Sequence, residues 1–189
     1  KAEDPLAIAH ENAGPYLVST KAIAVENTHN FGGGTVQPIE EIAKLSSAAH
    51  ARGIAMHLDG ARIWNAHIAS GTSFLEFGKH FDTISVCLSK GLGAPIGSVM
   101  LSDKDRVAKA RVWRKRYGAG MRQVGLLAGA AHYALDNNIA RLSEDHRRAK
   151  ELAVAIASVD SSFVDPALVE TNIVGLDLAN APYSAAELA

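Results

Sequence analysis

The chain has 189 residues and a formal net charge of −1, with 48% hydrophobic and 21% charged residues. This balance is typical of a globular protein with a substantial core, and it excludes a strongly basic nucleic-acid-binding protein. No apolar run is long enough to span a membrane, so we expect neither a membrane nor a nucleic-acid partner. The single cysteine, Cys87, excludes an intrachain disulfide and favours a reducing, cytoplasmic location.

Short apolar runs alternate with helical patterns in the first hundred residues. We expect strands at residues 22–25, 54–58 and 84–88, separated by helices at residues 38–52, 61–69 and 74–80. This alternation predicts an α/β fold with a mostly parallel sheet and flanking helices. A fourth strand at residues 98–101 follows the third without an intervening helix, so one antiparallel pairing is expected.

The second half of the chain is predicted to be largely helical, with helices at residues 103–117, 123–135 and 139–157. Short strands are expected at residues 163–164 and 171–178, with a turn at Asp165–Pro166 between them. We divide the chain into part of a large domain, residues 1–138, and a connecting helix with the start of a small α+β domain, residues 139–189. The lack of an initial methionine leads us to expect a fragment.

A glycine-rich turn follows the predicted strand at residues 84–88 and carries Ser89 and Lys90. Lysine is almost never fully buried unless it is paired or reacting. A desolvated lysine amine loses its charge readily and can form a Schiff base with a carbonyl. On the local pattern alone, however, an exposed turn residue is the commoner interpretation of Lys90.

A carboxylate, Asp59, ends the predicted strand at residues 54–58. Open α/β sheets place ligand-binding groups at this end of a strand, and His57 leaves the same face of the strand as Asp59. Taken alone, Asp59 is better explained as the N-cap of a helix that begins at Ala61. Together, Lys90 and Asp59 indicate pyridoxal phosphate, which needs a lysine for its aldehyde and an acidic or basic partner for its pyridine nitrogen.

Five segments follow one another along the chain: Glu26–Asn30, His57–Arg62, Cys87–Leu92, Ala94–Val99 and Gly120–Gln123. Together they resemble the threonine aldolases, which are pyridoxal-phosphate enzymes of the β-eliminating lyase group with an aspartate-aminotransferase-like, fold-type-I large domain. The resemblance implies retro-aldol cleavage of L-threonine or L-allo-threonine, a small amino-acid substrate, to glycine and an aldehyde. It also implies further chain at both ends, carrying a phosphate loop, a ring-stacking histidine and a carboxylate-binding arginine.

The resemblance implies a set of cofactor contacts. Lys90 holds pyridoxal 5′-phosphate as an internal aldimine, and Asp59 keeps the pyridine nitrogen protonated. Ser89 is expected to reach the cofactor phosphate, as hydroxyls and amides of such turns do. Arg122 resembles a family arginine that contacts a phosphate, across a subunit interface. Lys115 is placed near the same site, with a solvated surface position as an equal alternative.

Three further residues are assigned to the substrate. By resemblance, Arg62 contacts the substrate carboxylate, which suits a guanidinium fork, and the alternative is an exposed helix arginine. His29 lies in a polar loop and is a candidate base for the substrate hydroxyl, with a structural histidine as an equal alternative. Tyr16 falls where family members carry a histidine near that hydroxyl. His57 is expected to orient Asp59 or to pack beneath the ring.

Other functions remain open at this point. The same fold hosts β-elimination and transamination, so a different pyridoxal-phosphate reaction is the first alternative. A scaffold protein that has lost catalysis is the second. The resemblance implies a homo-oligomer built as a dimer of dimers, and the small-residue helix at residues 123–135 suits a subunit interface. We assign no metal ligands.

Overall fold

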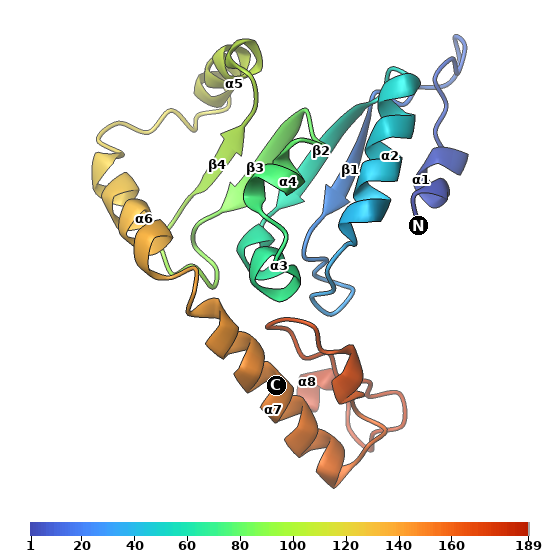
Figure 1. The fold of residues 1–189 in the computed structure, drawn as a ribbon, viewed down its shortest axis with the longest axis vertical. Coiled ribbons are helices and arrows are strands. Elements are labelled where there is room, and N and C mark those ends of the chain that lie inside the picture. Colours follow the sequence, from blue (N-terminus) through green and yellow to red (C-terminus); the bar gives the residue numbers. More distant parts are fainter. Residues whose placement is uncertain (189) are drawn as a thin grey trace.

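The computed structural model describes residues 1–188, which form an α/β fold around a four-stranded sheet (Figure 1). The first three strands are parallel and the fourth is antiparallel to the third. The predicted α/β class and the single antiparallel pairing are therefore confirmed. In their order across the sheet, the strands are β1 (Ala22–Glu26), β2 (Ala55–Gly60), β3 (Thr83–Cys87) and β4 (Ser98–Leu101).

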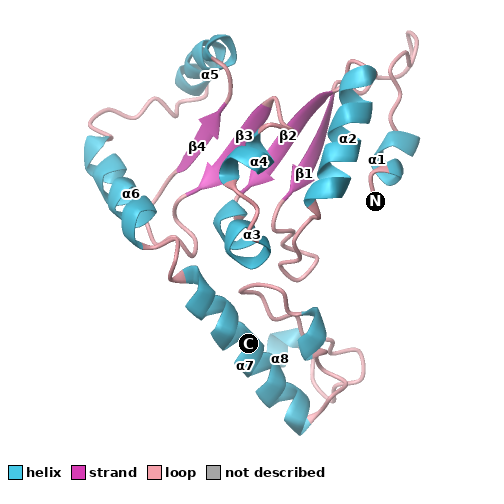
Figure 2. Cartoon of the chain, viewed as in Figure 1, coloured by secondary structure: helices cyan, strands magenta, loops and turns pink. Residues whose placement is uncertain are grey.

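Helices connect the strands and make up most of the second half of the chain (Figure 2). Gly71 ends α3 in the left-handed conformation, with φ of 71°, which glycine adopts readily at a helix C-terminus. The helices are α1 (Glu3–Ala7), α2 (Ile39–Ala51), α3 (Ile63–Ser70), α4 (Phe74–Gly78), α5 (Lys104–Arg116), α6 (Gly125–Asn137), α7 (Leu142–Val159), the 3-10 helix η1 (Pro166–Leu168) and α8 (Ala185–Leu188). Helix α1 was not predicted.

Helices α2, α3 and α4 cover one face of the sheet (Figure 1). Met56 and Leu58 of β2 point toward these helices and are fully buried. Because side chains alternate along a strand, His57 and Asp59 point to the opposite face. Asp59 is exposed there. In residues 1–188, the two faces of β2 therefore differ: the face toward α2, α3 and α4 is apolar and buried, and the opposite face carries polar side chains.

The C-terminal part of the chain packs on α7 without forming strands. The strands predicted at residues 163–164 and 171–178 are wrong, because within residues 1–188 those segments are irregular and flank η1. Val164 and Val169 are buried against α7 instead. A strand needs a hydrogen-bonding partner, and the apolar side chains here are satisfied by a helix face.

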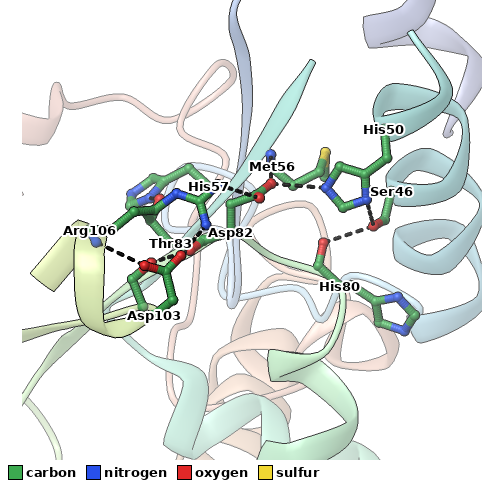
Figure 3. A network of polar contacts seen from close by, with 10 residues as sticks. Ser46, His50, Met56, His57, His80, Asp82, Thr83, Asp103 and Arg106 are labelled. Carbon is green, nitrogen blue, oxygen red and sulfur yellow. Dashed lines mark hydrogen bonds and ion pairs between the residues drawn. The ribbon is translucent and has the colours of Figure 1, made fainter. Parts of the chain in front are cut away.

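A polar network ties α2 and α5 to the N-terminal ends of β2 and β3 (Figure 3). Asp82 is its centre. One carboxylate oxygen accepts the N–H of Met56 at 2.8 Å and lies 2.9 Å from His50 Nε2, and the other accepts from Arg106 at 3.1 Å. The hydrogen bond from Met56 and the contacts with His50 and Arg106 hold the pKa of Asp82 below its usual value.

The same network includes His57, whose Nδ1 lies 2.8 Å from Thr83 Oγ1 (Figure 3). The predicted role of His57 in orienting Asp59 is therefore wrong, because the ring bonds sideways to the neighbouring strand. In residues 1–188, no helix has the length and apolar character required to cross a membrane.

Candidate active site

The three parallel strands end at one edge of the sheet, and each is followed by predicted site residues (Figure 1). In the strand register, Asp59 of β2 lies between Glu26 of β1 and Ser85 of β3. The N–H of Asn27 donates to the carbonyl of Asp59 at 3.0 Å, which joins the segment after β1 to β2. Lys90 follows β3 by three residues. This edge is where open α/β sheets bind ligands.

Asp59 is held by the turn that leads from β2 into α3. Its Oδ1 accepts the N–H of Ala61 at 3.1 Å. Strand β2 continues through Gly60 and α3 begins only at Ile63, with Arg62 as its N-cap residue. The interpretation of Asp59 as the cap of a helix starting at Ala61 is therefore wrong, and Arg62 does not share a helix with Asp59. The chain needs two residues to turn from the strand direction into the helix.

Gly60 marks a close approach of β2 to β3. A Cβ atom at this position would lie 3.0 Å from the carbonyl oxygen of Ser85. A side chain here would push the two strands apart and would displace Asp59 from the sheet edge. The close packing of β2 against β3 therefore requires glycine at position 60, independently of the turn that follows.

Lys90 lies on a tight turn after β3. The turn is closed by the N–H of Gly93, which donates to the carbonyl of Lys90 at 2.8 Å, and Lys90 Nζ lies 3.4 Å from Cys87 Sγ. Both Ser89 and Lys90 are exposed, so the desolvated lysine that the sequence suggested is not formed by residues 1–188. Cys87, expected to be buried, is only partly so.

Residues between α6 and α7 brace the lysine turn from the far side. Asn138 Nδ2 donates to the carbonyl of Leu92 at 2.8 Å, and Arg141 donates to the carbonyl of Gly91 at 3.3 Å. Sequence reasoning missed both residues, because they follow Lys90 by about fifty positions and carry no motif. Their contacts fix the backbone of the turn without touching the lysine amine.

His29 lies in the loop after β1 and is half-exposed. Its Nε2 is 3.7 Å from the Glu26 carboxylate, and the second oxygen of that carboxylate accepts the N–H of Asn30 at 3.0 Å. The N–H of His29 also donates to the carbonyl of Thr35 at 3.0 Å. Glu26 was not predicted as a site residue, although its position three residues before His29 is a usable signal.

Tyr16, Lys115 and Arg122 lie apart from this edge within the single chain. Tyr16 is 94% exposed in the segment before β1, at the opposite end of that strand. Lys115 is in the last turn of α5, and Arg122 lies between α5 and α6. Helix α6 has 13 residues. It therefore places the Arg122 loop roughly 20 Å from the end of α6 that meets the Lys90 turn.

A cavity of about 780 Å³ lies between β4, α5 and α6. Its lining is mostly apolar and includes Val99, Met121 and Leu127, together with Arg111 and Arg114. It takes in none of the residues that the sequence assigned to the cofactor or substrate. The lining does include Leu88, which precedes Ser89, and Ser85, which pairs with Asp59 in the strand register.

The sequence matches one protein family and is similar to several threonine aldolases. Residues 4–179 match the family described as β-eliminating lyase. The chain belongs to this family. It is 44% identical over 168 residues to a probable low-specificity L-threonine aldolase 2 of Arabidopsis thaliana, a match that covers 89% of this chain and 47% of the relative. It is 45% identical over 138 residues to the low specificity L-threonine aldolase of Escherichia coli K12, covering 73% of this chain and 40% of the relative.

Solved structures share the fold. The crystal structure of a putative L-allo-threonine aldolase from Listeria monocytogenes EGD-E superposes with a TM-score of 0.74 at 29% identity, covering 85% of this chain and 44% of that chain. The family and the fold predicted from the five segments are thus confirmed. The chain spans about half the length of the curated relatives it matches.

Proposed function

We propose that the protein is a pyridoxal-phosphate-dependent threonine aldolase, a carbon–carbon lyase that cleaves L-threonine and L-allo-threonine to glycine and an aldehyde. The observation that carries the proposal is that β2, which holds Asp59 and precedes Arg62, and β3, which precedes Lys90, are adjacent parallel strands ending at one edge of the sheet. Membership of the β-eliminating lyase family and the similarity to threonine aldolases support it.

The donor set fits pyridoxal phosphate. Lys90 provides an exposed amine for the aldehyde, and Asp59 provides a carboxylate for the pyridinium nitrogen. Only one Asp59 oxygen is engaged by the N–H of Ala61, so the second is available to the ring. Asp59 is exposed on the polar face of β2, where a bound group can reach it. When bound, the cofactor supplies an electron sink for the bond that breaks.

The cofactor phosphate has one candidate partner in the turn and two at a distance. Ser89 is next to Lys90 and exposed. Arg122 and Lys115 lie at the far end of α6, so their contribution to a phosphate requires a second subunit. We therefore propose a homo-oligomer, a dimer of dimers, in which these cations complete a neighbouring site. Exposed Leu126 on the small-residue helix α6 supports a subunit contact there.

The substrate steps are assigned to this chain's own side chains. Arg62 binds the substrate carboxylate through its guanidinium, which matches two oxygens at once. His29 accepts the substrate hydroxyl proton at Nδ1, the ring nitrogen that does not face Glu26. The Glu26 carboxylate, 3.7 Å from Nε2, stabilises the positive charge that the ring then carries. Tyr16 contacts substrate only if a neighbouring subunit brings it to the site.

The test uses the complete gene product. The protein is incubated with pyridoxal phosphate, reduced with borohydride, digested and mapped by mass spectrometry. We expect one adduct, on Lys90, and release of glycine and acetaldehyde from threonine. Lys90→Ala is expected to lose the adduct and the activity, whereas Lys79→Ala, at an exposed lysine of the α4 C-cap paired with Glu76, keeps both.

Two results would contradict the proposal. Labelling spread over Lys104, Lys109 and Lys115 with Lys90 unmodified would show that Lys90 is only a turn residue. Release of pyruvate and ammonia from serine, without aldehyde from threonine, would show a β-elimination enzyme on the same fold. We place the protein in the cytoplasm, on the basis of its single free thiol, Cys87.

A further inference from the structure

The loop that carries His29 is anchored by a segment far along the chain. Thr171 is fully buried, and its hydroxyl donates to the carbonyl of Gly34 at 2.6 Å across 137 positions. The neighbouring Glu170 carboxylate accepts the N–H of Val36 at 2.8 Å. Two consecutive residues of the C-terminal segment therefore hold two backbone groups of one loop.

The two segments are in close contact at Gly34. This residue is buried with φ of +76°, and a Cβ atom on it would lie 2.6 Å from Thr171 Oγ1 and 3.1 Å from Ile173 Cβ. Glycine is required here both by the backbone conformation and by the space. The loop and the C-terminal segment thus fit each other at one specific point, and sliding of one along the other would break the hydrogen bond.

The anchored groups lie on both sides of Thr35, whose carbonyl holds His29. The N–H of His29 donates to Thr35 at 3.0 Å, and the N–H of Gly34 donates back to the carbonyl of His29 at 2.9 Å. The hydroxyl of Thr171 is therefore linked to the backbone of His29 through Gly34, by one side-chain and one backbone hydrogen bond. Movement of Gly34 or Val36 would move the imidazole with it.

We propose that Thr171 and Glu170 are positioning residues that hold His29 against the substrate. This inference rests on the proposed function, in which His29 accepts the hydroxyl proton. The C-terminal segment then does more than pack on α7, since it sets the position of the base for the bond-breaking step. Small misplacements of a reacting group cost up to about 100-fold in rate.

The experiment compares Thr171→Val, which keeps the branched shape and removes the hydroxyl, with Thr171→Ser, which keeps the hydroxyl. The complete gene product loaded with pyridoxal phosphate is assayed with threonine. We expect Thr171→Val to lower kcat about tenfold or more, with KM and the Kd for the cofactor within about twofold of wild type. Thr171→Ser is expected to recover most of kcat.

A second readout does not depend on activity. In the cofactor-free protein, hydrogen–deuterium exchange of residues 28–37 should be faster in Thr171→Val than in wild type or Thr171→Ser. Glu170→Gln should give a smaller increase, because its hydrogen bond is exposed. The control is Thr20→Val, which removes a hydroxyl that accepts the N–H of His10 before β1 and should change neither kcat nor loop exchange.

Two outcomes would overturn the inference. The first is a Thr171→Val protein with wild-type kcat and wild-type loop exchange. The second is equal damage in Thr171→Val and Thr171→Ser, with loss of cofactor binding, which would indicate a packing role. A wild-type protein that releases no aldehyde from threonine would instead overturn the proposed function. Hydrogen–deuterium exchange of residues 28–37 in Thr171→Val would still test whether the hydrogen bond from Thr171 to Gly34 holds the loop.

Discussion

Gly32 lies against the ring of His29. A Cβ atom at this position would be 2.7 Å from His29 Nδ1 and 2.9 Å from Thr35 Oγ1. We therefore expect Gly32→Ala to displace the imidazole and lower kcat for threonine cleavage about 10- to 100-fold. The free energy of unfolding should change by less than about 1 kcal/mol, because the side chains are near the surface. Steady-state kinetics and urea denaturation measure the two quantities.

The matched control is Gly175→Ala, since a Cβ atom there would meet nothing within 4 Å. We expect this variant to keep wild-type kcat. A Gly32→Ala enzyme that is fully active would show that the position of His29 Nδ1 does not matter to the reaction. The assignment of His29 as the base would then be withdrawn, while Lys90 and Asp59 would be unaffected.

Asp82 joins three elements, because its carboxylate contacts β2, α2 and α5 at once (Figure 3). Its pKa in the folded protein is lower than usual, chiefly through the hydrogen bond from the N–H of Met56. The ionised carboxylate therefore stabilises the fold above its unfolded pKa of about 3.9, and this contribution is lost as the pH falls through the lower folded pKa.

We expect Asp82→Asn to lower the free energy of unfolding at pH 7 by about 1–3 kcal/mol, because it leaves the N–H of Met56 and the side chain of His50 facing an amide. The difference from wild type should shrink as the pH falls below about 4, because the carboxyl of the unfolded chain takes up its proton first, and it should be lost once the pH is below the lower folded pKa. Urea denaturation across this pH range measures both effects. Asp136→Asn, at an exposed position of α6, is the control, and a pH-independent difference would count against this assignment.

The two strands wrongly predicted in the C-terminal part of the chain show that a local sequence pattern is not sufficient to predict a strand. Residues 171–178 were predicted to form a strand, yet in the structure they are irregular. Their buried members contact the loop after β1 and the face of α7. A helix is stabilised by its own hydrogen bonds, whereas a strand exists only if another strand lies beside it. The helices were therefore predicted better than the C-terminal strands.

Strands β1 and β4 form the two edges of the four-stranded sheet, and within residues 1–188 no further strand pairs with the outer side of either one. All residues of β4 are exposed, including Val99, Met100 and Leu101. Exposed apolar edge strands promote association between chains. We expect residues 1–189, expressed alone, to associate increasingly as the concentration rises, and Met100→Lys to reduce this by placing a charge on the edge. Sedimentation velocity over a concentration series measures both.

The matched variant for this test is Lys109→Ala, at an exposed position of α5 away from the edge, which should associate like the parent chain. A parent chain that stays monomeric at every concentration would contradict the expectation. The same measurement on the complete gene product tests the proposed dimer of dimers, because a monomer there would leave Arg122 and Lys115 without a route to the cofactor phosphate.

Local chemistry in the sequence was sufficient to predict the α/β alternation, the antiparallel β4 and the segments carrying Asp59 and Lys90. These features depend on neighbours within a few positions, where hydrophobic period and turn residues act directly. The anchor from Thr171 to Gly34, the brace of Asn138 on the lysine turn and the separation of Arg122 from Lys90 were decided only by the tertiary structure. They join residues that are tens of positions apart, and no short-range pattern records which distant backbone group a side chain will meet once the chain has folded.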